Sequence, residues 1–337
     1  MSRRSTYSYT RSITSRRGFL QTLGGFGTSL TLPGYVTANL RKLNGPIKIG
    51  LIADLHHDVM HDGLRRLAAF LKAMEAENPD AIMQLGDFAY PNAKNKPVIE
   101  AFRKAHPHAF HVLGNHDIDD GHTFEEVAKL WGIQGRYYTE TIAGLHFVVL
   151  DGNEKPPNHR GGYPAHIGPR QLEWLASQLK QLNGPVVVFC HQPLAGPSSI
   201  DNTDQVQKVL SAAADKILLT INGHTHIDHL VRVGKIINLH INSASYYWVG
   251  SSHRHKSYSD EVHAAYPDIQ YTCPYQQSLF ATLTIEPATG VVNLKGRETR
   301  WVGESPAELG LNSRPERTLG EEICPRIRVR RLLRPLG

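Results

Sequence analysis

The sequence predicts an α/β fold in which a largely parallel β-sheet is covered by helices. Apolar runs of strand length alternate with segments whose apolar residues recur every three or four positions. The polar residues that follow the first three runs are 33 and 28 residues apart, close to the roughly 30 residues of a strand–helix–strand unit. Of the 337 residues, 40% are hydrophobic and 20% are charged, which excludes a disordered or collagen-like chain.

The expected strands are the apolar runs, and most of them end at a polar residue. They are residues 47–53, 81–85, 109–113, 145–150, 186–190, 217–221, 236–241, 279–285 and 291–294. Ligands of α/β proteins bind just beyond the carboxyl ends of parallel strands. We therefore expect the polar residues at these ends to gather at one edge of the sheet.

Four helices are expected between these strands. The helical patterns cover about 64–74, 127–130, 172–182 and 206–213. The first pattern follows Asp62 and is stopped by Pro79. Thr123 and Glu126 have the spacing of a capping box ahead of the second pattern, and Gly132 ends it.

The positive charge of the chain lies at its two ends. The formal net charge is +6, yet residues 1–38 contain five arginines and no acid, and residues 314–337 contain seven arginines. The body between them is slightly acidic, so it gives no sign of a nucleic-acid surface, and we expect no nucleic-acid partner.

The N-terminal segment resembles a bacterial twin-arginine signal. Arg16 and Arg17 precede a modestly hydrophobic stretch, and Val36-Thr37-Ala38 offers small residues for cleavage. Glycines and a proline interrupt the stretch, and the chain has no run of 18 apolar residues, so we expect no stable membrane span. The resemblance implies the twin-arginine export machinery as a partner and a periplasmic or otherwise exported protein. A disordered basic tail is the alternative.

Five short motifs at the strand ends carry the candidate chemistry. They are Asp54-x-His56, Gly86-Asp87, Gly114-Asn115-His116-Asp117, His191 and Gly223-His224-Thr225-His226. Oxygen and imidazole donors without thiolate suit manganese, iron or zinc rather than a structural zinc cage. Alternate residues of an extended segment point the same way, so the Asp-x-His and His-x-His pairs are each expected to converge. Each motif alone could be an ordinary turn, but the five together indicate a metal centre.

The five motifs resemble those of the calcineurin-like metallophosphoesterases. The resemblance implies a four-layer α/β/β/α sandwich of two mixed β-sheets with outer helices, and a site for two divalent or trivalent transition metal ions. For one metal it implies the ligands Asp54, His56, Asp87 and His226. For the other it implies Asp87, Asn115, His191 and His224, so that Asp87 bridges the two ions.

The same resemblance implies catalytic roles for His116, beside the leaving group, and for Asp117, as its orienting partner. An imidazole next to a carboxylate has a raised pKa and can donate a proton to a departing alkoxide near neutral pH. Two cations roughly 3.5–4 Å apart can hold a bridging hydroxide that attacks phosphorus. Loop architecture alone is the alternative for His116 and Asp117.

Two differences from the purple acid phosphatase pattern indicate the branch of the superfamily that this chain resembles. Gly86-Asp87-Phe88-Ala89-Tyr90 is similar to a purple acid phosphatase block whose tyrosine binds iron. However, His56 stands where those enzymes have glycine, and Asp117 where they have glutamate. Both favour the branch that resembles bacterial class III cyclic-nucleotide and glycerophosphodiester phosphodiesterases, in which Tyr90 would not be a ligand.

We therefore expect an exported phosphodiesterase for small-molecule phosphoesters. A phosphomonoesterase that scavenges phosphate, and a non-catalytic envelope binding module, are the alternatives. The expected segments are a signal peptide over 1–38, a metallophosphoesterase domain over 39–311 and an arginine-rich tail over 312–337. The polar, tyrosine-rich segment 245–278 is expected to be irregular. Its candidates for a substrate wall, with a packed or solvated segment as the alternative, are Tyr246, Tyr247, Trp248, His253, Arg254 and His255.

Overall fold

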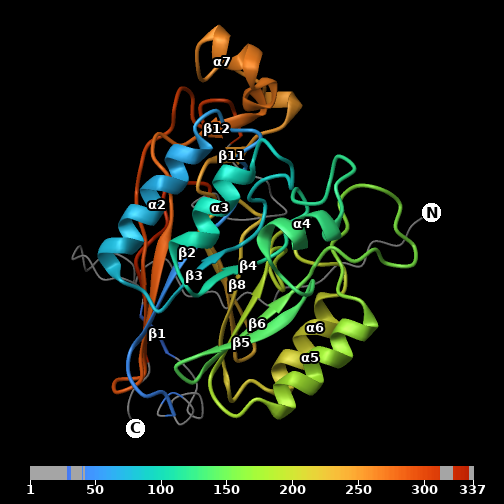
Figure 1. Ribbon diagram of the computed structural model, residues 1–337, viewed down its shortest axis with the longest axis vertical. Helices are drawn as coiled ribbons and strands as arrows, with labels where there is room; N and C mark the ends of the chain where they lie inside the picture. The colour runs from blue at the N-terminus through green and yellow to red at the C-terminus, as the bar shows by residue number, and fades with distance from the viewer. Residues whose placement is uncertain (1–28, 32–39, 41, 312–321, 334–337) are drawn as a thin grey trace, which may run out of the picture.

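Two large mixed β-sheets form the centre of the computed structural model, which describes residues 29–31, 40, 42–311 and 322–333 (Figure 1). The strands of the first sheet are β1 (Ser29–Thr31), β2 (Ile47–Ile52), β3 (Ala81–Gln84), β4 (Ala109–His111), β13 (Ala281–Glu286), β14 (Val291–Lys295) and β15 (Arg330–Leu333). Their order is β1-β15-β14-β13-β2-β3-β4. Strands β2, β3 and β4 run parallel, whereas β13 and β14 add antiparallel pairs.

The second sheet has the order β5-β6-β7-β8-β10-β9. Its strands are β5 (Tyr138–Ile142), β6 (Leu145–Leu150), β7 (Val186–Cys190), β8 (Ile217–Asn222), β9 (His229–Val233) and β10 (Ile236–His240). The four central strands are parallel, and β5 and β9 are antiparallel edges. The two apolar faces of the sheets pack on each other through residues such as Leu51, Phe147 and Phe189.

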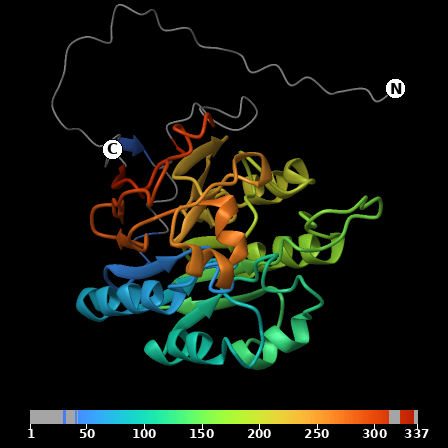
Figure 2. The same cartoon turned by 90° about the horizontal axis from the view of Figure 1, so that it is seen from above.

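Helices cover the outer face of each sheet. Helices α2 (Gly63–Glu77), α3 (Lys96–Ala105) and α4 (Phe124–Trp131) pack on the first sheet through residues such as Phe70 and Phe102. Helices α5 (Pro169–Gln181) and α6 (Thr203–Ala212) pack on the second through Leu175 and Leu210. Figure 2 shows the blue and cyan helices on one side of the sheets and the yellow-green helices on the other. The predicted four-layer sandwich is confirmed.

All nine predicted strands and four predicted helices are present. The capping box of α4 forms as predicted, with Glu126 N donating to Thr123 Oγ1 at 3.3 Å, and Gly132 ends the helix at φ 76°. Helix α3 and strands β5 and β9 were not predicted. The apolar residues of β5 and β9 are few and partly exposed, whereas α3 buries Val98, Ile99 and Phe102 and was missed in the sequence. None of the described helices has the length and apolar character needed to cross a membrane.

The segment 245–278 forms more structure than its sequence predicts. Strands β11 (Tyr246–Trp248) and β12 (Thr272–Pro274) pair with each other. Between them lie η1 (Ser251–His253), α7 (Asp260–Ala265) and η2 (Pro267–Tyr271). The orange helix α7 projects at the top of Figure 1. This segment supplies one wall of the site described next.

Candidate metal centre

The predicted ligand residues follow β2, β3, β4, β7 and β8, and the structure brings them together at the carboxyl ends of these strands. Five of them have left-handed backbone conformations: φ is 51° at Asp54, 45° at His56, 51° at Asp87, 67° at His224 and 51° at His226. Such angles are costly for residues other than glycine and persist only where the surroundings hold them, which is typical of functional sites. The sequence analysis expected the Asp-x-His and His-x-His pairs each to converge through an extended backbone. In the structure the backbone at these residues is left-handed; Asp54 and His56 belong to one group, whereas His224 and His226 belong to the two different groups described next.

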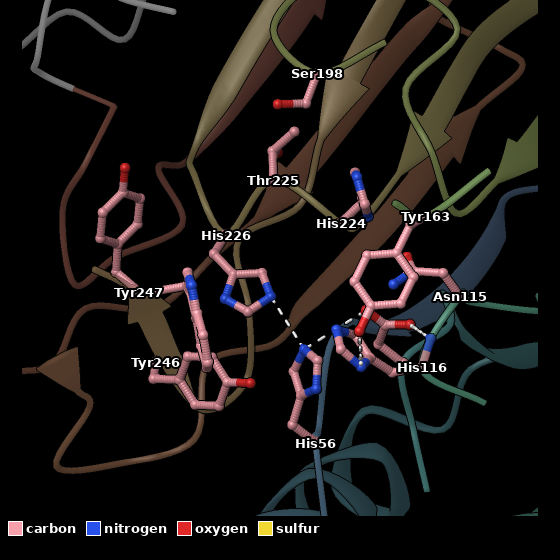
Figure 3. A pocket seen from close by; sticks show the side chains of 12 residues that line it. His56, Asn115, His116, Tyr163, Ser198, His224, Thr225, His226, Tyr246 and Tyr247 are labelled. Carbon is pink, nitrogen blue, oxygen red and sulfur yellow. Dashed lines mark hydrogen bonds and ion pairs between the residues drawn. The ribbon is translucent and has the colours of Figure 1, made fainter. Parts of the chain in front are cut away.

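The first group consists of Asp54, His56 and His226, and all three side chains are buried. The Nε2 atoms of His56 and His226 lie 3.1 Å apart, and His226 Nε2 lies 3.3 Å from Asp54 Oδ1. The backbone N–H of His224 donates to the Asp54 carboxylate at 3.0 Å, which orients it toward this group. Figure 3 shows His56 and His226 facing each other.

The second group consists of Asp87, His191 and His224. His191 Nε2 lies 3.1 Å from Asp87 Oδ2 and 3.2 Å from His224 Nδ1. The other ring nitrogen of His191 lies 2.7 Å from the carbonyl oxygen of Leu85, to which it donates. This hydrogen bond orients Nε2 toward Asp87 and His224, as in most metal-binding histidines. Burial, with His191 nearby, lowers the pKa of His224 to about 3. Burial also opposes the charge of His191, but Asp87 outweighs it and raises the pKa of His191 to about 9, so a metal ion bound at His191 Nε2 would replace a proton there.

Asp87 connects the two groups. Its Oδ2 lies 3.1 Å from His191 Nε2 and 3.6 Å from His56 Nε2, while its Oδ1 accepts the backbone N–H of His116 at 2.8 Å. Burial opposes the negative charge, but His191 and the other neighbouring imidazoles keep the pKa of Asp87 well below its usual range. An ionised carboxylate therefore faces both groups, as a bridging ligand requires.

The donor set fits two cations. Of two imidazole nitrogens that face each other at 3.1 Å, only one can donate a hydrogen to the other, whereas a cation accepts both lone pairs. Oδ1 of Asn115 is buried and has no hydrogen-bond partner among the described residues. It is the neutral oxygen donor that the sequence predicts for the second ion. Metal binding would satisfy these groups, whose burial without partners is otherwise costly.

His116 lies at the edge of this centre, and its carboxylate partner is Asp119. His116 Nδ1 lies 2.7 Å from Asp119 Oδ2, and Asp87 and Asp119 outweigh burial to raise the pKa of His116 to about 9. The predicted partner, Asp117, does not face His116. It is fully buried and accepts backbone N–H groups of Asp87, Phe88, Ala89 and Gly114 at 2.8–3.2 Å. The role predicted for Asp117 is therefore corrected: it holds the backbone that carries Asp87.

A cavity of about 450 Å³ opens over the two groups, and twelve residues line it (Figure 3). The sequence analysis missed Tyr163, whose hydroxyl donates to Asp119 at 2.9 Å and whose ring lies 4.8 Å from that of His116. Tyr246, one of the candidates for a substrate wall, stacks on His56 with ring centroids 4.9 Å apart. Trp248 and Tyr247 also line the cavity, whereas His253, Arg254 and His255 do not. Tyr163 lies in a glycine-rich loop without periodicity, so no signal in the sequence identified it.

Comparison with known proteins agrees with this arrangement. The family profile described as "Calcineurin-like phosphoesterase" matches residues 47–228, which include all five motifs. No curated protein matches the sequence significantly.

Solved structures share the fold. A dimetal phosphatase from Danio rerio is similar with a TM-score of 0.52 and 16% identity, over 77% of this chain and 99% of that chain. GAP50, the anchor in the inner membrane complex of Plasmodium, is similar with a TM-score of 0.51 and 14% identity, over 77% and 89% of the two chains. Purple acid phosphatase PPD1 from yellow lupin seeds is similar with a TM-score of 0.50 and 10% identity, over 88% and 55%.

Proposed function

This chain belongs to the calcineurin-like phosphoesterases, which makes it a metal-dependent hydrolase of phosphoesters, and we propose that it is a phosphodiesterase for small molecules. The observation that carries the proposal is the placement of Asp87 between two groups of metal-binding side chains, at the floor of a cavity with His116 at its edge.

The two groups would hold a dinuclear centre of manganese, iron or zinc. Asp54, His56 and His226 would bind one ion, His191, His224 and Asn115 the other, and Asp87 both. When bound, such ions supply Lewis acidity toward phosphoryl oxygens and lower the pKa of water toward neutrality.

His116 is proposed as the proton donor to the leaving alcohol. It lines the cavity, and Asp119 and Tyr163 surround its Nδ1 at 2.7 and 3.4 Å. The contact between Nδ1 and Asp119 stabilises a protonated ring and directs Nε2 away from the carboxylate. Asp119 is therefore a positioning residue in this proposal.

Three features support a diester over a monoester. Neither this cavity nor the one beside it is lined by a lysine or arginine from the described part of the chain. A phosphomonoester dianion has one more negative charge than a diester to be neutralised. The adjoining cavity, of about 500 Å³, also provides room for a second substituent on phosphorus. His56 and Asp117, at the positions where the purple acid phosphatase pattern differs, favour the phosphodiesterase-like branch as well.

The test compares two chromogenic substrates. Protein reconstituted with manganese, iron or zinc is expected to hydrolyse bis(p-nitrophenyl) phosphate with a kcat/KM at least about tenfold above that for p-nitrophenyl phosphate. The reverse preference would support the phosphatase alternative. Two bound metals without turnover of either ester would support the non-catalytic binding module.

Export is proposed from the sequence pattern. The twin-arginine pair Arg16-Arg17 lies outside the described residues, and so does most of the signal peptide proposed over 1–38. We propose residues 39–311 as the catalytic domain and the periplasm as the destination. The described part of the arginine-rich segment 312–337 adds β15 and the core residues Ile327 and Leu332 to that domain. Replacing both arginines by lysine should trap precursor in the cytoplasm, because a receptor reads the pair and not simply its charge. Unchanged periplasmic yield would contradict the proposal.

A further inference from the structure

We propose that the second cavity beside the metal centre binds a cationic ammonium group on the substrate's leaving alcohol; this inference rests on the phosphodiesterase activity proposed above. The cavity has a volume of about 500 Å³ and shares His116, Tyr163, Tyr246 and Trp248 with the cavity over the metal-binding groups. It therefore begins where the proposed proton donor stands. A leaving alcohol protonated by His116 would extend into it.

Aromatic rings form much of the wall. Trp248 of β11 lies between Tyr246 and Tyr271, with ring centroids 6.3 and 5.7 Å away. Tyr90 and Tyr163 complete the aromatic lining. The contacts among the rings hold them in place, and 43% of Trp248 remains exposed. Its ring lines both cavities, so part of the indole surface is accessible to a ligand there.

Carboxylates line the same cavity. Asp119, Asp120 and Asp268 contribute to it, and no lysine or arginine from the described residues does. Oδ1 of Asp119 is buried and has no hydrogen-bond partner within the described part of the chain. Tyr90 donates its hydroxyl hydrogen to Asp120 at 3.2 Å, which leaves that carboxylate with lone pairs to spare. This environment disfavours an anionic substituent.

Aromatic faces and carboxylates together select a cation. The negative face of an aromatic ring attracts an ammonium group, most strongly when the ring is tryptophan. Nearby carboxylates add Coulombic attraction without demanding the hydrogen-bond geometry of a sugar or a base. A quaternary or primary ammonium group on a short alkyl chain is the substituent that satisfies both.

The test uses two phosphodiesters that differ only in charge. Methyl phosphocholine carries a trimethylammonium group, and methyl 3,3-dimethylbutyl phosphate is its neutral isostere. The measured quantity is the ratio of kcat/KM for the cationic diester to that for the neutral one. We expect Trp248→Leu to lower this ratio about threefold to tenfold. Asp268→Asn should lower it about twofold to threefold through the lost charge.

Asp260→Asn is the matched control. Asp260 lies in the same segment, but it is exposed on α7, pairs with Lys256 and does not line the cavity. The kcat/KM ratio of Asp260→Asn should equal that of the parent protein. If Trp248→Leu and Asp268→Asn both leave the kcat/KM ratio at its value in the parent protein, the inference is overturned.

A binding measurement separates this inference from the proposed activity. Calorimetric titration of the metal-loaded protein with choline chloride, at constant ionic strength, should show binding that Trp248→Leu weakens. Absence of turnover with both diesters would refute the phosphodiesterase, yet the titration would still decide whether the cavity binds a cation. Absence of choline binding, with turnover intact, would refute the cavity's assignment alone.

Discussion

Replacing Arg330 by methionine should destabilise the protein, because a buried carboxylate would lose its main cationic partner. Asp228 is completely buried, and its Oδ1 pairs with Nη1 of Arg330 in β15. Arg328 Nη1 lies 3.4 Å from Oδ2 of the same carboxylate, and Asp228 N donates to Glu322 O at 3.0 Å. Asp228 lies two residues after His226, so the C-terminal segment holds the end of a proposed metal-binding loop.

The magnitude follows from the burial of the pair. Removing one partner of a buried ion pair typically costs 3–5 kcal/mol, because the other charge stays buried without compensation. Arg328 would remain, but its side chain is 31% exposed and it lies farther away, so we expect about 3 kcal/mol. For a domain of this size, about 2 °C of melting temperature corresponds to 1 kcal/mol. The expected shift of the melting temperature is therefore about 6 °C downward.

Thermal unfolding followed by circular dichroism measures this shift, and Arg331→Met is the control. Arg331 is the next residue of β15 and is exposed, so its replacement should change the melting temperature by about 1 °C or less. Adding Asp228→Asn to Arg330→Met removes the uncompensated charge and should restore part of the lost stability. Equal shifts for the two arginine variants, or no recovery in the double variant, would refute the reasoning.

Three further predictions concern the site and the core. Asp87→Ala should retain fewer than one metal equivalent per chain by elemental analysis, because Asp87 faces both groups; full occupancy would contradict its bridging position. His116→Ala should slow hydrolysis of an alkyl diester roughly 10²–10⁴-fold and that of a p-nitrophenyl diester far less, since p-nitrophenolate departs without a proton; equal losses would exclude proton donation. Burial lowers the pKa of His111 to about 3. Between pH 6.5 and 3 the unfolded state therefore binds a proton that the folded state does not, and the free energy of unfolding decreases as the pH is lowered. His111→Gln should remove about 1.4 kcal/mol per pH unit of that fall in urea unfolding at pH 7 and 5, and an unchanged dependence would contradict the assignment.

The strand ends and the types of side chain at them could be predicted from the sequence alone. Apolar runs followed by Asp, Asn or His mark both the strands and the edge where ligands gather, because both patterns depend on neighbouring residues in the chain. The predicted ligand residues from Asp54 to His226 accordingly lie at one place in the structure. Their convergence, by contrast, depends on left-handed backbone conformations that the residue types permit but do not specify.

Only the tertiary structure decided which carboxylate faces His116. Asp117 is adjacent in the sequence, but the turn directs it inward to four backbone N–H groups, and Asp119 takes its place. The aromatic and acidic cavity likewise combines residues 90 and 119 with residues 248 and 271. Asp228 meets Arg330 across 102 positions of the chain. The pattern of neighbouring residues in the sequence reflects the periodicity of strands and helices. Contacts between residues far apart in the chain depend on how whole sheets pack, and no local pattern encodes that packing.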